Sequence, residues 1–337
     1  MTTVQKYVFP IINEKRDSLV CSQTGTGKTL AYALPLIHHF ERNPEDGLNA
    51  IVITPSRELA LQQEHEINRI SPGICEAIYG GTQKKYQIDA LQNPKLRIVV
   101  ATLGRLVDIL DSETVKRSKI DFLILDEADY LVCDHEESLR KLYAALNFID
   151  ETTLKTRKGK TQCWISATFS NYSQKLANKY LVNDYVFTNC SGDSPGIPSH
   201  IVDQKVIITK KPFLKELNLM KELKAFFSDP ETSPSAKVII FVAELISVQR
   251  IQSSVQQEDI TYENGELPKC AAICSTITQE QREHNLNLFR SGQVRIIVAT
   301  DILSRGMDIK DINLRQKVFH SYSYRPSKNY LSFLDCL

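Results

Sequence analysis

Residues 18–29 read SLVCSQTGTGKT, a short apolar run followed by a glycine-containing turn and the start of a helical pattern. Glycines at positions 25 and 27 permit a tight turn whose backbone amides point inward. Inward amides at a helix N-terminus form a positive cradle for phosphate oxygens. Lys28 can reach the β- and γ-phosphates of a nucleotide, and the Thr29 hydroxyl can ligate magnesium. This stretch predicts a strand–loop–helix unit that binds a nucleoside triphosphate.

The phosphate-loop pattern G-x-x-x-x-G-K-[ST] is complete except at its first position, where Ser22 replaces glycine. A chance Gly–Lys turn is the alternative interpretation. The strand before the loop, the helix after it and the acidic residues farther along the chain argue against chance. We therefore expect the whole loop to contact the nucleotide, namely Ser22, Gln23, Thr24, Gly25, Thr26, Gly27, Lys28 and Thr29.

A second apolar run ends abruptly in carboxylates, because residues 122–131 read FLILDEADYL. Asp126 ends the predicted strand, where it can hold magnesium through water. Glu127 can accept a proton from the water that attacks the γ-phosphate. Acidic residues after a strand are common in loops, so this motif alone is weak. Together with the phosphate loop before it, the motif predicts ATP hydrolysis with Lys28, Asp126 and Glu127 as catalytic residues.

Short apolar runs alternate with longer helical patterns along the chain. Continuous apolar strands between helices are typical of a parallel sheet that is covered on both faces, which predicts an α/β fold. In the first half, the predicted strands are residues 18–21, 50–54, 97–102, 122–126 and 162–168. In the second half, we predict strands at 204–209, 237–243 and 294–301, and a helix at 213–227.

The alternation breaks at residues 190–200, CSGDSPGIPSH, whose Gly, Pro and Ser content is typical of a linker. A chain of 337 residues is also too long for one ordinary core and fits two α/β domains. We predict a first lobe at 1–191, a linker at 192–201 and a second lobe at 202–337.

The bulk composition is that of a soluble globular protein, with 42% hydrophobic and 24% charged residues. The formal net charge of +1 means that any nucleic-acid contact must come from local patches. The eight cysteines contain no C-x-x-C pair, so reduced cysteines are expected and a zinc site is not. The sequence contains no run apolar enough to span a membrane and no signal-peptide pattern. We expect an intracellular protein of the nucleus or cytoplasm.

The ordered series of motifs resembles the DEAD-box family of ATP-dependent RNA helicases. The D-E-A-D tetrapeptide itself is residues 126–129. The other matching elements are TTVQK (2–6), TPSRELA (54–60), Gly80-Gly81, ATLGRL (101–106), SAT (166–168), TQEQREHNLNLFRSG (278–292) and ATDILSRGMDI (299–309). Ser56, Leu103 and Ser304 stand where the family has Thr, Pro and Ala. The resemblance covers roughly residues 3–314, and the order of the motifs makes it specific.

The resemblance implies two tandem RecA-like P-loop lobes with parallel sheets, the second incomplete, which bind ATP, Mg²⁺ and RNA. Gln5 would recognise adenine, and Asp308 would bind the ribose from the second lobe. Ser166 and Thr168 would join the catalytic set by linking the nucleotide state to the RNA face, with Asp129 as their partner. The contacts between the lobes would involve Asp129 and Arg305.

Arginines beside predicted strand ends suit RNA binding. Arg57 and Arg105 lie in loops that can offer amides and guanidinium groups to phosphates, without reading sequence. Each arginine alone is better explained as a solvated charge, whereas the set on one sheet edge favours RNA. The basic run LKTRKGK at 154–160 is expected to be a solvated loop, with added RNA affinity as the alternative. By resemblance, the RNA backbone would contact Pro55, Arg57, Gly81, Thr102, Arg105, Thr300 and Asp301.

The tail departs from the family after GMDIKDINL. The family continues with an H-R-x-G-R-x-x-R element whose arginines reach the γ-phosphate, and this tail contains only Arg315 and Arg325. We expect that element, and the last strand and helix of the second sheet, to be missing, as in an alternative or frameshifted terminus. An arginine finger contributes ~10³–10⁵-fold in turnover, so we expect ATP binding with weak hydrolysis. The aromatic residue that stacks on adenine in the family also has no counterpart before Gln5.

Two functions fit these observations. The first is an ATP-dependent RNA helicase that locally unwinds or remodels RNA duplexes. The alternative is a catalytically impaired ATP- and RNA-binding protein that acts as a competitor or scaffold. A DNA helicase or an unrelated P-loop ATPase is disfavoured by the combination of Gln5, SAT and DEAD. We expect a monomer without membrane contact, and the sequence identifies no protein partner.

Overall fold

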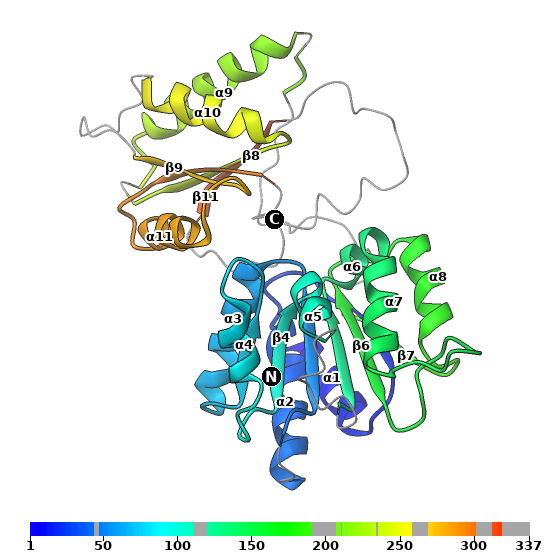
Figure 1. The fold of residues 1–337 in the computed structure, drawn as a ribbon. Helices are drawn as coiled ribbons and strands as arrows, with labels where there is room; N and C mark the ends of the chain where they lie inside the picture. Colours follow the sequence, from blue (N-terminus) through cyan, green and yellow to red (C-terminus); the bar gives the residue numbers. More distant parts are fainter. Residues whose placement is uncertain are drawn as a thin grey trace. The chain divides into compact units, whose positions relative to one another are not determined.

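The structure is a computed structural model that describes residues 1–43, 47–110, 120–190, 207–209, 211–233, 235–257, 269–300 and 312–318 (Figure 1). The described residues form two compact units, one up to residue 190 and one from residue 207 onward. Each unit is a parallel sheet with helices, which confirms the predicted α/β class. The predicted linker at 192–201 lies outside the described residues, so the lobe boundaries stay a prediction.

The first unit alternates strands and helices from its second element onward, except that α6 and α7 follow one another between β5 and β6. Its strands are β1 (Ser18–Cys21), β2 (Ala50–Thr54), β3 (Cys75–Ile78), β4 (Ile98–Thr102), β5 (Phe122–Asp126), β6 (Thr161–Ser166) and β7 (Val186–Asn189). Its helices are α1 (Thr3–Asn13), α2 (Lys28–Arg42), α3 (Arg57–Ile70), α4 (Lys84–Ala90), α5 (Leu103–Leu110), α6 (Ala128–Asp134), α7 (Glu136–Ala145) and α8 (Asn171–Tyr180).

The strands of this sheet are hydrogen-bonded in the order β3-β4-β2-β5-β6-β1-β7, and every pair is parallel. Side chains alternate between two apolar layers. Leu123 and Leu125 of β5 face the layer that includes α5 to α8, whereas Phe122 and Ile124 face the layer that includes α1 to α3. Burial on both faces explains the continuous apolar runs. Parallel pairing also brings the carboxyl ends of all seven strands to one edge of the sheet.

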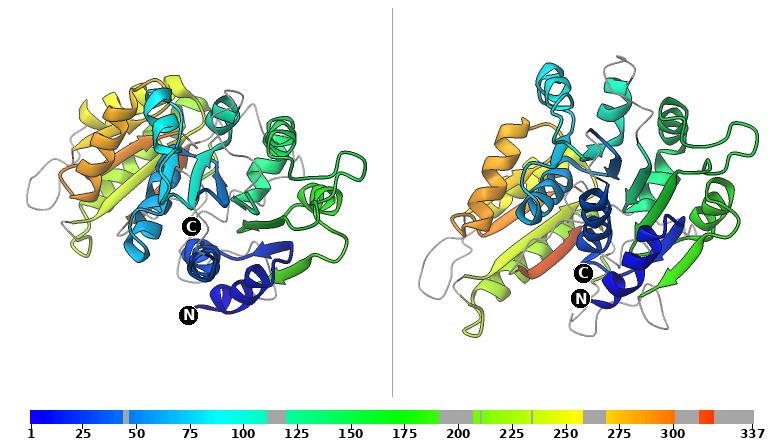
Figure 2. Two further views of the ribbon diagram at one scale, coloured as in Figure 1. Left: turned by 60° about the horizontal axis from the view of Figure 1, so that its bottom comes forward. Right: turned by 90° about the horizontal axis from the view of Figure 1, so that it is seen from below.

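The second unit has a four-stranded parallel sheet in the order β11-β8-β10-β9. Its strands are β8 (Lys237–Val242), β9 (Cys270–Ile273), β10 (Ile296–Ala299) and β11 (Ile312–Val318), and its helices are α9 (Pro212–Phe227), α10 (Leu245–Gln257) and α11 (Gln279–Arg290). Leu223 and Ile251 pack on one face of the sheet, and Phe289 packs on the other. Figure 1 accordingly shows α9 and α10 on one side and α11 on the opposite side, and Figure 2 gives two further views.

The sequence predicted every interior strand of both sheets and missed every edge strand, namely β3, β7, β9 and β11. An edge strand is less covered by neighbours, so its sequence needs no continuous apolar run. Residues 312–318 form β11 beside β8. The expected absence of the arginine element and of the last strand and helix concerns the tail after residue 318, which lies outside the described residues. The strand predicted at 204–209 is not seen in its described part, residues 207–209.

Candidate functional site

Six of the seven parallel strands lead to predicted site residues of the first unit at one edge of its sheet, the edge formed by the carboxyl ends of the strands. The loop from Ser22 to Gly27 follows β1, Asp126 ends β5 and Ser166 ends β6, and these three strands are neighbours in the order β5-β6-β1. Residues predicted to contact RNA follow the adjoining strands β2, β4 and β3. The edge is thus divided into a half that carries the predicted phosphate loop and a second half that carries arginines.

The phosphate loop has the backbone that its glycines predict. Gly25 and Gly27 have φ angles of +79° and +90°, in the left-handed region that favours glycine. A Cβ atom on Gly27 would lie 2.5 Å from Nε2 of Gln5, which donates to the Gly27 carbonyl at 3.3 Å. Ser22 and Thr26 join their hydroxyls at 2.7 Å across the loop. The loop is therefore closed on itself and is held from α1 by Gln5.

Three buried charged residues meet beside this loop. Lys28, the first residue of α2, donates from Nζ to Oε1 of Glu127 at 3.1 Å. Burial lowers the pKa of Lys28, but the negative charges of Glu127 and Asp126 outweigh it and raise the net pKa. Burial, with the Glu127 charge, raises the pKa of Asp126 to about 6. The lysine is therefore charged at neutral pH.

The carboxylate of Asp126 is held by donors from three elements. Its Oδ1 accepts the backbone N–H of Glu127 at 3.0 Å. Its Oδ2 accepts Nε2 of Gln63 from α3 at 2.5 Å and the hydroxyl of Tyr32 from α2 at 3.4 Å. Gln63 and Tyr32 were missed by the sequence analysis. No local pattern marks them, because their contact with Asp126 exists only after the strands are ordered in the sheet.

Glu127 has an unusual backbone for a non-glycine residue. Its φ angle is +53°, in the left-handed region, and it immediately precedes α6. Such a conformation costs about 1–2 kcal/mol and is enriched at functional sites. The turn aims the Glu127 carboxylate toward Lys28 on another element.

A second cluster joins the end of β6 to the start of α6. Asp129 accepts the Ser166 hydroxyl at 2.6 Å through Oδ1 and the Thr168 hydroxyl at 3.1 Å through Oδ2. These contacts match the expectation that Asp129 is the partner of the SAT motif. The three carboxylates of the DEAD motif thus lie in two clusters. Asp126 and Glu127 lie near Lys28, and Asp129 accepts the hydroxyls of the SAT motif.

The arginines predicted to contact RNA are positioned by neighbouring loops. The guanidinium of Arg57 packs on Gly81, where an added Cβ would lie 2.5 Å from Nη1. Arg105 donates from Nη1 to Oε1 of Gln87 at 3.0 Å and from Nη2 to the Thr82 carbonyl at 3.0 Å. The close approach to Gly81 thus holds Arg57 at the end of β3, and the two hydrogen bonds hold Arg105 just after β4.

Basic residues of the run at 154–160 form hydrogen bonds within the first unit. Arg157 donates to the Ile149 carbonyl, and Lys160 donates to the Ile120 carbonyl. The run precedes β6, so it lies at the amino ends of the strands, opposite the edge that carries Arg57 and Arg105. This position favours the interpretation of a structural surface loop over an RNA contact.

The second unit contributes one described residue of the predicted site. Thr300 is buried and directly follows β10, whereas Asp301, Arg305 and Asp308 lie outside the described residues. Arg315 lies within β11 but its side chain is not described, and Arg325 also falls outside. The predicted joint action of the two lobes therefore stays a prediction.

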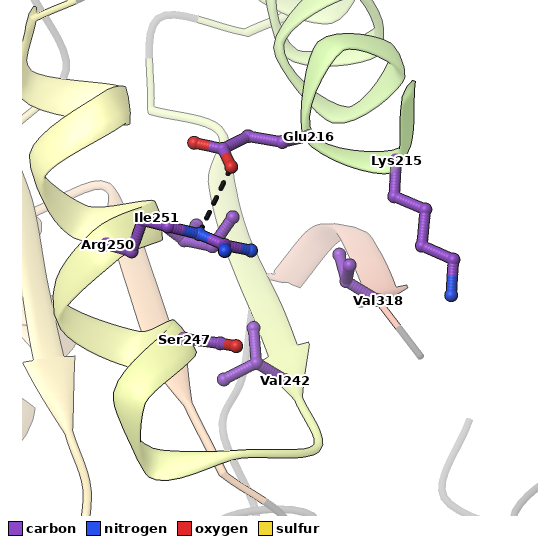
Figure 3. Close-up of a pocket in the computed structure, with 7 residues that line it drawn as sticks. All are labelled: Lys215, Glu216, Val242, Ser247, Arg250, Ile251 and Val318. Carbon is purple, nitrogen blue, oxygen red and sulfur yellow. Dashed lines mark ion pairs between the residues drawn. The ribbon is translucent and has the colours of Figure 1, made fainter. Parts of the chain in front are cut away.

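A small hollow in the second unit contains none of the predicted site residues (Figure 3). It is lined by Lys215, Glu216, Val242, Ser247, Arg250, Ile251 and Val318. Arg250 and Glu216 form an ion pair across its rim, with Nε and Oε2 3.2 Å apart.

Within the described ranges, no three His, Cys, Asp or Glu side chains cluster so that they could hold a metal ion on their own. None of the described helices could cross a bilayer.

Known protein families match both units. The sequence profile of the DEAD/DEAH box helicases matches residues 2–176, more than half of the chain, and that of the helicase conserved C-terminal domain matches residues 215–316. The chain belongs to the DEAD/DEAH box helicase family. The family resemblance inferred from the motifs is thereby confirmed.

Individual DEAD/DEAH box helicases resemble the chain over nearly its whole length. It is 31% identical over 324 residues to the ATP-dependent RNA helicase dbp3 of Sclerotinia sclerotiorum, covering 93% of this chain and 50% of the relative. It is 32% identical to DEAD-box ATP-dependent RNA helicase 14 of Arabidopsis thaliana, covering 92% and 47%. A structure of Mss116p bound to ssRNA and AMP-PNP has a TM-score of 0.81 at 26% identity, covering 94% and 63%. The chain spans about half the length of the curated relatives that it matches.

Proposed function

We propose that this chain is an ATP-dependent RNA helicase, which hydrolyses ATP when RNA is bound and locally unwinds or remodels RNA duplexes. The observation that carries the proposal is the buried cluster of Lys28, Asp126 and Glu127 beside a closed phosphate loop. Two relatives named as RNA helicases, and the solved structure of a similar protein bound to ssRNA and AMP-PNP, support RNA and ATP as the ligands.

The donor set near the phosphate loop fits a magnesium ion bound together with ATP. Asp126 and Glu127 are two buried carboxylates that share one buried cation, Lys28, so the cluster carries excess negative charge. Hydroxyl and carboxylate oxygens are the ligands that Mg²⁺ prefers. Thr29 and Asp126 would hold the ion, which when bound neutralises charge on the phosphates.

The residues of the chain have separate tasks in this proposal. The loop amides and Lys28 bind the phosphates of ATP. Glu127 takes the proton of the attacking water, because its carboxylate is held beside Lys28 at the loop. Gln5 recognises adenine and, through its bond to Gly27, ties that recognition to the loop. From the second lobe, Asp308 binds the ribose.

The remaining residues connect the nucleotide to RNA. Asp129, Ser166 and Thr168 form a hydrogen-bonded link between the start of α6 and the end of β6, and in this proposal the link carries the nucleotide state toward the RNA face. Backbone contacts by both lobes bind RNA without reading its sequence. We assign these contacts to Pro55, Arg57, Gly81, Thr102, Arg105, Thr300 and Asp301, and we assign Asp129 and Arg305 to contacts between the lobes. Since ATP and RNA occur together inside cells, the proposed location is the nucleus or cytoplasm, and the proposed state is a monomer.

Phosphate release from ATP tests the proposal. It is measured with Mg²⁺, with and without single-stranded RNA, on the wild-type chain and on Glu127→Gln. We expect weak, RNA-stimulated release by the wild type and a loss of at least ~100-fold in the variant, which lacks the general base. Binding of a fluorescent ATP analogue should survive in Glu127→Gln, because the amide still accepts from Lys28.

The outcome also separates the two candidate functions. RNA-stimulated release that disappears in Glu127→Gln supports the helicase, and strand displacement on a short RNA duplex then tests unwinding. Binding of ATP and RNA by the wild type with release no higher than in Glu127→Gln would support the impaired competitor or scaffold instead.

A further inference from the structure

Gln63 makes the shortest of the described side-chain contacts to the Asp126 carboxylate. It lies in α3 with no exposed surface, and its Nε2 is 2.5 Å from Oδ2 of Asp126. The other donor to that oxygen, the Tyr32 hydroxyl, is at 3.4 Å. Groups that hydrogen-bond a metal-binding carboxylate fix its orientation, and their loss typically weakens metal binding by about 10–100-fold.

The orientation of the Gln63 amide is set by this contact. Its Oε1 is buried and has no hydrogen-bond partner among the described residues. A buried carbonyl oxygen without a partner costs about 1–3 kcal/mol, so the glutamine is poorly explained by stability alone. Reversing the amide would place Oε1 against the Asp126 carboxylate and would remove the hydrogen bond. The amide orientation that leaves Oε1 without a partner is thus the one in which Nε2 donates to Asp126.

Helix α3 connects this contact to the arginine half of the sheet edge. The helix begins at Arg57, and Gln63 is six residues farther along, about 9 Å on the helix axis. Between and beyond these residues, Leu59, Ala60 and Ile67 are buried in the core of the unit. A helix anchored in this way moves as one body, so a shift at Arg57 is carried to Gln63.

We propose that Gln63 is a positioning residue that orients the Asp126 carboxylate and thereby couples RNA contact at the start of α3 to Mg²⁺-dependent ATP binding. The inference rests on the proposed function, since it assigns a mechanism to the same site. Gln63 does not itself contact the ion or the phosphates in this scheme. Gln63 instead affects the Mg²⁺ concentration that nucleotide binding requires and the change in that concentration when RNA binds.

The test is an Mg²⁺ titration of fluorescent ATP-analogue binding by the full chain, with and without single-stranded RNA. Gln63→Met keeps the length of the side chain and removes the donor. Gln162→Met is the matched control, because Gln162 is also fully buried but bonds to Tyr143, Trp164 and Thr156. Gln63→Asn, which shortens the amide by one methylene, serves if the methionine variant does not fold.

We expect the Gln63 variants to need about tenfold more Mg²⁺ for half-maximal binding, with binding restored at saturating Mg²⁺. RNA should lower the Mg²⁺ requirement of the wild type and have little effect on that of the variants. Gln162→Met should lower the unfolding temperature and leave the Mg²⁺ titration unchanged.

A folded Gln63 variant with the wild-type Mg²⁺ requirement would overturn the inference, and so would an equal shift in Gln162→Met. The readout does not need turnover, so it stays informative if the wild type binds ATP without hydrolysing it. In that case the proposed function fails while the role of Gln63 is still decided. A wild-type chain without Mg²⁺-dependent binding would overturn both.

Discussion

Gly27 and Glu127 both adopt left-handed backbone conformations, yet only the first is a glycine. At Gly27 the absence of Cβ is required twice, by the φ of +90° and by the close approach of Gln5. At Glu127 the φ of +53° is tolerated because the turn brings the carboxylate to Lys28. The left-handed conformation is thus unstrained at Gly27 and strained at Glu127, and strained residues of this kind are common at functional sites.

Alanine at the two loop glycines separates backbone strain from side-chain contact. Gly25→Ala and Gly27→Ala should each lose about 1–2 kcal/mol from the left-handed backbone. Gly27→Ala should lose more, because its Cβ displaces Gln5, whereas a Cβ on Gly25 meets no atom within 4 Å. Urea unfolding of the first unit, followed by circular dichroism, measures the difference. In a Gln5→Ala background the two losses should become equal, and a persistent gap would contradict the assigned clash.

Helix α3 contributes to both halves of the sheet edge. Ser56 caps it by accepting the Leu59 N–H at 3.2 Å, Arg57 is its first residue and Gln63 reaches Asp126 from its second turn. Helix α8 of the same unit begins with an equivalent cap, in which Ser170 accepts the Ser173 N–H at 3.1 Å. The two caps are alike in chemistry, but only α3 starts with an arginine assigned to RNA.

Removal of the two serine caps should therefore have equal effects on stability and unequal effects on RNA binding. Ser56→Ala and Ser170→Ala should each cost about 1 kcal/mol of unfolding free energy, the usual value for a lost N-cap. Only Ser56→Ala should weaken RNA affinity, because fraying at that end releases Arg57. Fluorescence anisotropy with a labelled RNA provides the measurement. Equal RNA affinities in both variants would argue against α3 as an RNA-binding element.

On the scale of the whole molecule, the charge is nearly balanced, with a formal net charge of +1. Long-range attraction of a polyanion is therefore weak, and RNA affinity must come from a few local contacts. In the proposed function, the first sheet separates these contacts from the nucleotide, with strands β2, β4 and β3 on one side and β5, β6 and β1 on the other. The basic run at 154–160 lies at the opposite edge of the same sheet.

The salt dependence of RNA binding distinguishes these two positively charged regions. Each phosphate contact to single-stranded RNA contributes about −0.7 to the slope of log K against log salt concentration. Arg57→Ala and Arg105→Ala should each reduce the slope by about that amount. Lys158→Ala, which removes an exposed charge from the basic run, should leave it unchanged. A smaller slope in Lys158→Ala, with no change in the arginine variants, would indicate that RNA binds at the edge that carries the basic run.

The sequence by itself determined the α/β class, the interior strands, the phosphate loop and the pair of acids at the end of β5. These are local properties, because a strand buried on both faces needs a continuous apolar run and a phosphate loop needs glycines before a lysine. Family motifs added the assignment of Asp129 to Ser166 and Thr168, which hydrogen bonds in the structure match.

Only the tertiary structure decided the edge strands and the partners of the buried groups. Edge strands such as β7 and β11 form because a neighbouring strand offers main-chain hydrogen bonds, whatever their side chains. The contacts from Gln5 to Gly27 and from Gln63 to Asp126 join residues 22 and 63 positions apart. Such contacts depend on the order of strands in the sheet, which no local pattern encodes, so the residues that orient the site became visible only after folding.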